Sequence, residues 1–147
     1  MYEKLDYCIN CYENEENLYT LELWYDLGCE HAVSILEEFN DDDWNKLIEE
    51  IPNKSDAWMK RLAYCFADIH NEKALKILLS MVYTEDIETF QFVLTGLKHY
   101  DRKLIPNMRD IINQIIKFDD DADIIAKDIF VNFLKKMKES EEQHIQR

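Results

Sequence analysis

Four cysteines and four histidines are the residues of this 147-residue chain best suited to bind a metal ion or to act as nucleophiles. Cys8 and Cys11 have the two-residue spacing with which thiolates chelate zinc, and Cys29 and His31 could complete a set of four ligands. However, Cys8 and Cys11 also share one side of a predicted amphipathic helix with Leu5, which is typical of small core residues. We therefore predict that these cysteines pack in the core and bind no metal.

Two other metal motifs in the C-terminal third are incomplete. Asp119, Asp121 and Asp123 resemble the start of a calcium loop, but Ile124 stands where the sharp turn of that loop requires glycine. A single Glu-x-x-His occurs at 141–144, whereas a di-metal helical bundle needs two such pairs with further carboxylates. Neither motif predicts a metal site.

The sequence contains no recognisable catalytic motif. No local motif places a Ser or Cys nucleophile beside His31, His70 or His99. Gly28 and Gly96, the two glycines, stand apart, so no glycine-rich loop can cradle a phosphate. We expect a protein that is not an enzyme and that uses no cofactor.

The most distinctive feature is acidic charge in the first third of the chain. The formal net charge is −14, and residues 1–54, with 15 acidic and three basic residues, account for −12 of it. We predict a partner-binding surface made of Glu13, Glu15, Glu16, Glu22, Asp26, Glu30, Glu37, Glu38, Asp41, Asp42 and Asp43. Such a surface either only keeps the protein soluble or docks a cationic protein. It disfavours nucleic acid and anionic membranes as partners.

The elements that must position these residues are helices. Two glycines and two prolines are too few for the turns of an all-β or doubly wound fold. A chain of this length fits one domain, 1–147, and it lacks a run of 18 apolar residues. The N-terminus does not resemble a signal peptide, so we expect a cytoplasmic protein with reduced cysteines.

Residues 55–100 have the clearest helical periodicity, with three amphipathic segments joined by short polar connections. We expect Ser55, Asn71 and Thr84 to cap these helices. Short joints fold successive helices back as antiparallel neighbours, and an offset of about 32 to 34 residues relates the segments. The expected architecture is all-α, with about seven to nine helices in stacked antiparallel hairpins, either a HEAT-like solenoid or a compact bundle. Trp44 and Trp58 should lie at its centre.

Other residues mark predicted helix boundaries. Gly28 should end or kink a helix in the left-handed conformation. Pro106 suits a first helical turn. The acidic run 119–123 should begin the last helix, whose tail should fray from about residue 139.

A family resemblance follows from two segments, DDDWNKLIEEI at 41–51 and SDAWMKRLAYCFAD at 55–68, with the leucine-rich helix after them. Over about residues 29–100 the chain resembles the HEAT-like immunity proteins of bacterial contact-dependent growth-inhibition and polymorphic-toxin systems. The resemblance implies a non-enzymatic inhibitor that binds a cognate toxin, a basic nuclease domain that cuts RNA, in a one-to-one complex.

Two alternatives remain at this point. The chain could be a helical-repeat adaptor or regulatory subunit whose acidic face is incidental. It could also be a metal-binding or enzymatic helical domain that uses Cys8 and Cys11.

Overall fold

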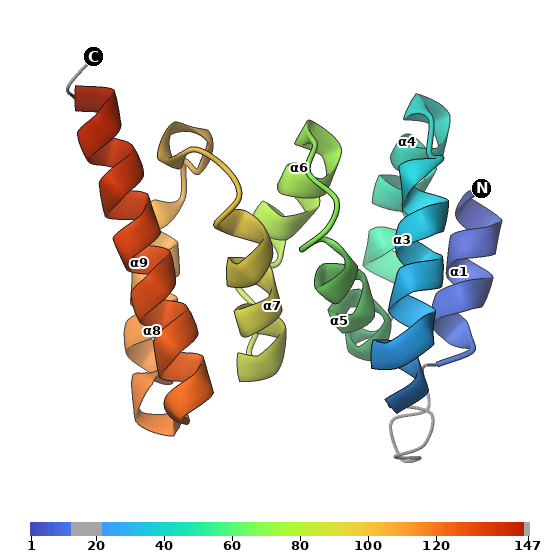
Figure 1. The fold of residues 1–147 in the computed structure, drawn as a ribbon. Coiled ribbons are helices and arrows are strands. Elements are labelled where there is room, and N and C mark those ends of the chain that lie inside the picture. The colour runs from blue at the N-terminus through green and yellow to red at the C-terminus, as the bar shows by residue number, and fades with distance from the viewer. Residues whose placement is uncertain (13–21, 146–147) are drawn as a thin grey trace. The chain divides into compact units, whose positions relative to one another are not determined.

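The computed structural model describes residues 1–12 and 22–145, with the side chains of the last helix described as far as Glu141. In this part of the chain every regular element is helical, with eight α-helices and no strand (Figure 1). The prediction of an all-α protein with about seven to nine helices is confirmed. None of the described helices is long and apolar enough to cross a membrane.

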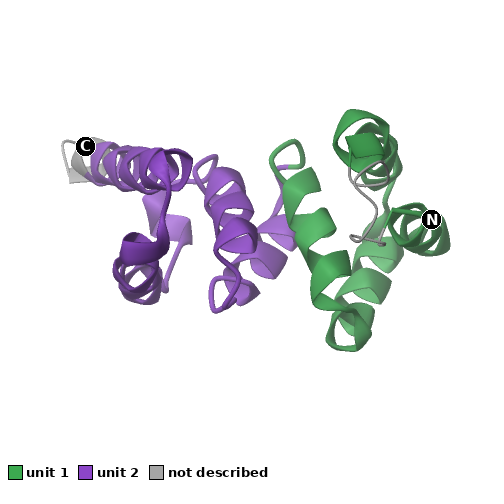
Figure 2. Cartoon of the chain, turned by 90° about the horizontal axis from the view of Figure 1, so that it is seen from below, with its two compact units in different colours: residues 1–69 green, residues 70–147 purple. Residues whose placement is uncertain are grey.

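The chain divides into two compact units, Met1–Ile69 and His70–Arg147 (Figure 2). Each unit has its own set of buried apolar side chains. Because a compact unit need not fold alone, a single domain over residues 1–147 stays a prediction.

In the first unit, α1 packs against α3, α4 and α5 (Figure 1). The elements of this unit are α1 (Tyr2–Asn10), the π-helical segment η1 (Trp24–Gly28), α3 (Cys29–Glu37), α4 (Asp41–Glu50), the 3-10 segment η2 (Ile51–Asn53) and α5 (Asp56–Cys65). Trp24, Trp44 and Trp58 are all buried. The predicted central packing of Trp44 and Trp58 is confirmed.

Side-chain caps fix where the helices of the first unit begin. Asn40 and Asp43 form a reciprocal capping box at α4, in which Asn40 Oδ1 accepts from the Asp43 N–H at 2.9 Å. Ser55 Oγ accepts from the Trp58 N–H at 3.1 Å, as predicted for α5. These caps satisfy backbone donors that no helical carbonyl reaches.

The predicted left-handed helix end at Gly28 is wrong. Gly28 has helical dihedral angles, φ −62° and ψ −41°, and lies where η1 runs directly into α3. A β-carbon at this position would lie 2.7 Å from Trp24 Cε3 and 2.9 Å from Tyr12 Cε2. The site therefore requires glycine because two aromatic rings approach the backbone, and not because of a turn.

In the second unit, α7 packs against both α6 and α9. The elements are α6 (Glu72–Ser80), α7 (Ile87–Leu97), the 3-10 segment η3 (Arg102–Leu104), α8 (Met108–Phe118), the 3-10 segment η4 (Asp119–Asp121) and α9 (Ile124–Ile145). Phe90 contacts the rings of Phe118 and Phe130 at centroid distances of 5.3 and 5.8 Å. These aromatic contacts join α7 to α8 and α9.

Helix boundaries of the second unit match the predictions only in part. Asn71 caps α6 as predicted, through a 2.9 Å hydrogen bond from the Ala74 N–H. The cap of α7 is Asp86 and not Thr84, because Asp86 Oδ2 accepts from the Thr89 N–H at 2.9 Å. Pro106 precedes α8 rather than lying in its first turn. The backbone of α9 stays helical to Ile145, beyond the predicted start of fraying.

Candidate functional site

Four acidic residues line one side of the continuous helical segment 22–37, which contains η1 and α3, and we call them the acidic stripe. The stripe consists of Glu22, Asp26, Glu30 and Glu37, all exposed. Since a π-helical turn absorbs an extra residue, the eight residues from Glu22 to Glu30 make about two turns. The seven residues from Glu30 to Glu37 also make about two α-helical turns. The continuous face predicted for Glu22, Asp26 and Glu30 is therefore present, and Glu37 extends it.

The predicted acids around the α3–α4 connection have different environments. Glu38, Asp41 and Asp42 are exposed. Asp43 is only 17% exposed, with one oxygen 3.6 Å from the Met1 amino group and the other accepting from the Asn40 N–H. Asp43 thus has a structural role within the unit. Glu13, Glu15 and Glu16 lie outside the described residues.

The charge of the stripe is not neutralised by neighbours within the described residues. Among the lysines of the first unit, Lys46 pairs with Glu50 at 3.2 Å and Lys54 with Asp6 at 2.6 Å. No described Lys or Arg forms an ion pair with the stripe or with Glu38, Asp41 or Asp42. The described part of this surface therefore carries a concentrated negative charge.

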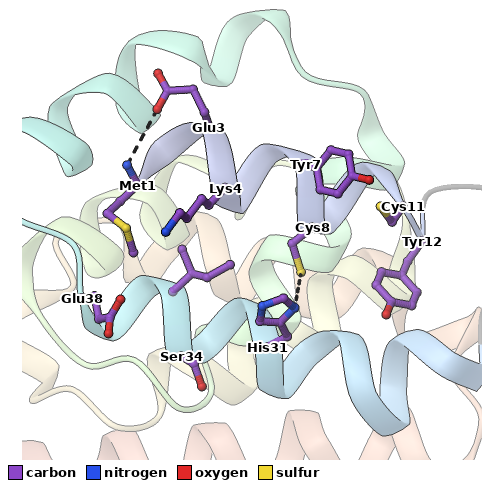
Figure 3. Close-up of a pocket in the computed structure, with 11 residues that line it drawn as sticks. Met1, Glu3, Lys4, Tyr7, Cys8, Cys11, Tyr12, His31, Ser34 and Glu38 are labelled. Atoms are coloured by element: carbon purple, nitrogen blue, oxygen red, sulfur yellow. Dashed lines mark hydrogen bonds and ion pairs between the residues drawn. The ribbon is translucent and has the colours of Figure 1, made fainter.

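A groove of about 670 Å³ runs between α1 and α3 (Figure 3). One end has aromatic, thiol and imidazole groups, and the other has charged groups. The lining residues are Tyr7, Cys8, Cys11, Tyr12 and His31 toward the first end and Met1, Glu3, Lys4 and Glu38 toward the second, together with Ser34 and Ile35 of α3. This volume lies in the range of clefts that bind ligands or partner side chains.

The thiol of Cys8 faces His31 in this groove. Cys8 Sγ lies 3.8 Å from His31 Nδ1 and 3.8 Å from the carbonyl oxygen of Gly28, to which it donates. Burial raises the pKa of Cys8, and the neighbouring Cys11 and Cys29 raise it further. Because a thiolate is the nucleophilic form, this pair lacks the activation expected of a catalytic dyad.

The four groups considered for zinc do not come together as a ligand set. Cys11 is exposed, while the Cys29 thiol hydrogen-bonds to Cys65. That hydrogen bond lowers the pKa of Cys29, whereas burial followed by the same bond raises that of Cys65. Within the described ranges, no group of three or more Cys, His, Asp or Glu side chains is arranged to hold a metal ion.

A partly exposed lysine, Lys54, helps to hold α1 in position as one wall of the groove. Lys54 Nζ donates to Asp6 Oδ1 and lies 5.5 Å from the ring centroid of Tyr2 and 5.0 Å from that of Trp58. Burial acts to lower the pKa of Lys54, but hydrogen bonds to Asp6 and Tyr2 outweigh it and raise that pKa overall. Asp6 and Lys54 are 48 residues apart, so no local motif in the sequence indicates this contact.

The histidines of the second unit also form a contact that no sequence motif indicates. The rings of His70 and His99 stack with their centroids 4.2 Å apart, and the Tyr100 ring meets His70 edge-on. The Tyr100 hydroxyl contacts the backbone N–H and carbonyl of Asn71. This cluster joins the start of α6 to the end of α7.

No family model, curated protein or solved structure matches this chain. Its first unit combines an acidic stripe with a groove between α1 and α3.

Proposed function

We propose that this chain is an inhibitory binding protein that docks a cationic protein domain against the acidic face of its first unit. One observation carries the proposal: the acidic stripe and the acids at the α3–α4 connection are exposed, and no described Lys or Arg pairs with them. Like charges four residues apart cost an isolated helix a few tenths of a kcal/mol each. Cationic side chains of a partner would offset this repulsion by attracting the same carboxylates.

The cationic partner that best fits this surface is a nuclease domain. A nuclease cleft is basic because it holds phosphates, so an acidic inhibitor competes with the substrate for the same charges. Electrostatic complementarity of this kind raises association rates and selects the partner more than it adds affinity. The resemblance to immunity proteins of contact-dependent growth inhibition agrees with this assignment, with a toxin domain encoded by the neighbouring gene as the partner.

Charge reversal tests the proposal. The variant Glu22→Lys, Asp26→Lys, Glu30→Lys should associate with the neighbouring gene product about 10 to 100 times more slowly at low salt, with a flatter salt dependence. Stopped-flow association at several salt concentrations measures both effects.

The matched control reverses three exposed acids of the second unit, Asp119, Asp120 and Asp121, and changes the net charge equally. It should slow association much less than the stripe variant. Equal rates for the two variants would contradict a docking role for the stripe, as would an unchanged rate for the stripe variant.

A second candidate function, an adaptor, is favoured by apolar side chains of the second unit. Six large ones on α8 and α9 are exposed: Ile112, Ile116, Ile124, Ile125, Val131 and Leu134. Exposed apolar surface of this kind marks interaction sites, so an adaptor could hold another partner there. The two functions differ in a measurable way, because an inhibitor abolishes its partner's activity at one equivalent whereas an adaptor leaves that activity intact.

A further inference from the structure

The groove between α1 and α3 has the form of a helix-binding site. Its walls are two helical stripes: residues 4, 7, 8 and 11 from α1 and its C-cap, and residues 31, 34, 35 and 38 from α3 and its C-cap. Met1 and Glu38 lie toward one end, on opposite walls, while Tyr12 and His31 lie toward the other, so the two walls run antiparallel (Figure 3). The nine residues of α1 span roughly 13 Å, which matches about two turns of a third helix.

The floor and rim of the groove have the chemistry of a protein interface. Cys8 and Ile35 form a buried apolar floor, and the Tyr7 side chain is 75% exposed at the rim. Tyrosine is one of the residues most enriched among those that dominate binding energy, especially where a pocket lies beside it. The groove therefore offers anchor positions to apolar side chains of a partner.

The charge around the groove differs between its two walls. On the α3 side, Glu38 lines the groove, and the exposed stripe residues Glu30 and Glu37 directly precede the lining residues His31 and Glu38 in the sequence. On the α1 side, Glu3 lies near the Met1 amino group, 3.8 Å away, and beside Lys4. Cations are therefore favoured along the α3 wall, over a length of about two helical turns.

We propose that this groove receives one amphipathic, basic helix of the cationic partner. Apolar side chains of that helix at positions i, i+4 and i+7 lie over Tyr7, Cys8 and Ile35. Lysines or arginines on one flank face Glu30 and Glu37, whose seven-residue spacing equals about two turns. The inference rests on the proposed function for its partner, and it identifies the part of that partner that is bound.

Two synthetic peptides of 14 residues test the groove without the native partner. Both contain only leucine and lysine in equal numbers, one arranged with helical periodicity and the other strictly alternating as in a strand. The helical peptide should bind at least ten times more tightly than the alternating one in fluorescence anisotropy at 0.15 M salt. Equal affinities would overturn the proposal, because they would mean that charge alone attracts the peptides.

Variants of the protein locate the binding. Tyr7→Ser should weaken binding of the helical peptide at least tenfold, and Ser34→Trp, which fills the groove from an exposed position, should do the same. Leu104→Ser is the matched control, because Leu104 is 46% exposed in η3 and lies outside both the groove and the apolar set on α8 and α9. The control should bind the peptide as the parent protein does. Unchanged binding in both groove variants would overturn the proposal.

The native complex separates this inference from the proposed function. If the stripe variant associates slowly while Tyr7→Ser and Ser34→Trp leave the dissociation constant unchanged, the groove proposal fails and the acidic docking surface stands. If the groove variants weaken the complex tenfold through faster dissociation, the groove proposal is supported. The groove variants could weaken binding of the helical peptide while the stripe variant associates with the neighbouring gene product at the parent rate. In that case only the proposed function fails.

Discussion

Replacing Gly28 by alanine sets two physical effects of opposite sign against each other. The residue is helical, so alanine should gain about 1 kcal/mol from helix propensity. Against this, the added β-carbon meets two ring carbons, Trp24 Cε3 at 2.7 Å and Tyr12 Cε2 at 2.9 Å. Carbon atoms in good contact lie about 3.5 to 4.0 Å apart, so both rings must move.

The environment of Trp24 decides which effect is larger. Its indole is fully buried, and the guanidinium of Arg61 lies 5.4 Å from the ring centroid. Overpacking a tight site costs roughly 1 to 3 kcal/mol, and two simultaneous overlaps against a confined ring favour the upper part of that range. After the propensity gain is subtracted, Gly28→Ala should destabilise the protein by about 1 to 2 kcal/mol.

Urea unfolding followed by circular dichroism at 222 nm measures this change in the free energy of unfolding. A loss of 1 to 2 kcal/mol should also lower the melting temperature by several degrees. If Gly28→Ala proves as stable as the parent or more stable, the steric argument is refuted and the glycine has no packing role.

A double variant provides the control for Gly28→Ala. In a Trp24→Leu background the indole ring that the new methyl group meets is gone, and Gly28→Ala should cost markedly less or become stabilising. The difference between the two backgrounds is the coupling energy of the pair. Additive effects would mean that the overlap with Trp24 is not the cause.

Three further predictions concern packing, capping and thiol reactivity. Trp58→Ala should cost about 3 to 5 kcal/mol in urea unfolding, because the side chain is only 1% exposed. Asp86→Ala should destabilise the protein by about 1 kcal/mol, because the Asp86 carboxylate caps α7, and Thr84→Ala should destabilise it by less. A larger loss of stability in Thr84→Ala than in Asp86→Ala would show that Thr84 is the cap. Iodoacetamide at pH 8 should alkylate the exposed Cys11 first. Cys65 is buried and its pKa is raised, so it should react only on unfolding. Mass spectrometry after timed quenching shows which of the two cysteines has been alkylated.

Periodicity and capping chemistry are local properties, and they were predictable from the sequence. The 3.6-residue spacing of apolar side chains identified the helices, and Ser55 and Asn71 identified where α5 and α6 begin. The wrong prediction at α7 has a local cause. Both Thr84 and Asp86 are good capping residues, and Thr84 instead accepts a hydrogen bond from the Asp86 N–H at 3.2 Å.

Features that depend on long-range packing were not predictable in this way. The left-handed conformation assigned to Gly28 followed from glycine's general preference, whereas its real constraint comes from Trp24 and Tyr12. The groove exists only because α1 lies against α3. For the same reason, the Cys29–Cys65 hydrogen bond joins residues that no spacing rule connects. The acidic stripe was predictable because its members share one helix.

The π-helical segment Trp24–Gly28 has a consequence for how the length of this chain can vary. A π-helical turn contains about one residue more than an α-helical turn. Removing Leu27, whose side chain is 58% exposed, would let the segment rewind as an ordinary α-helix. Glu22 and Glu30 would then be seven residues apart and still about two turns apart. A single-codon deletion here would thus be absorbed by the backbone, and homologous chains one residue shorter could present the same charges at the same places.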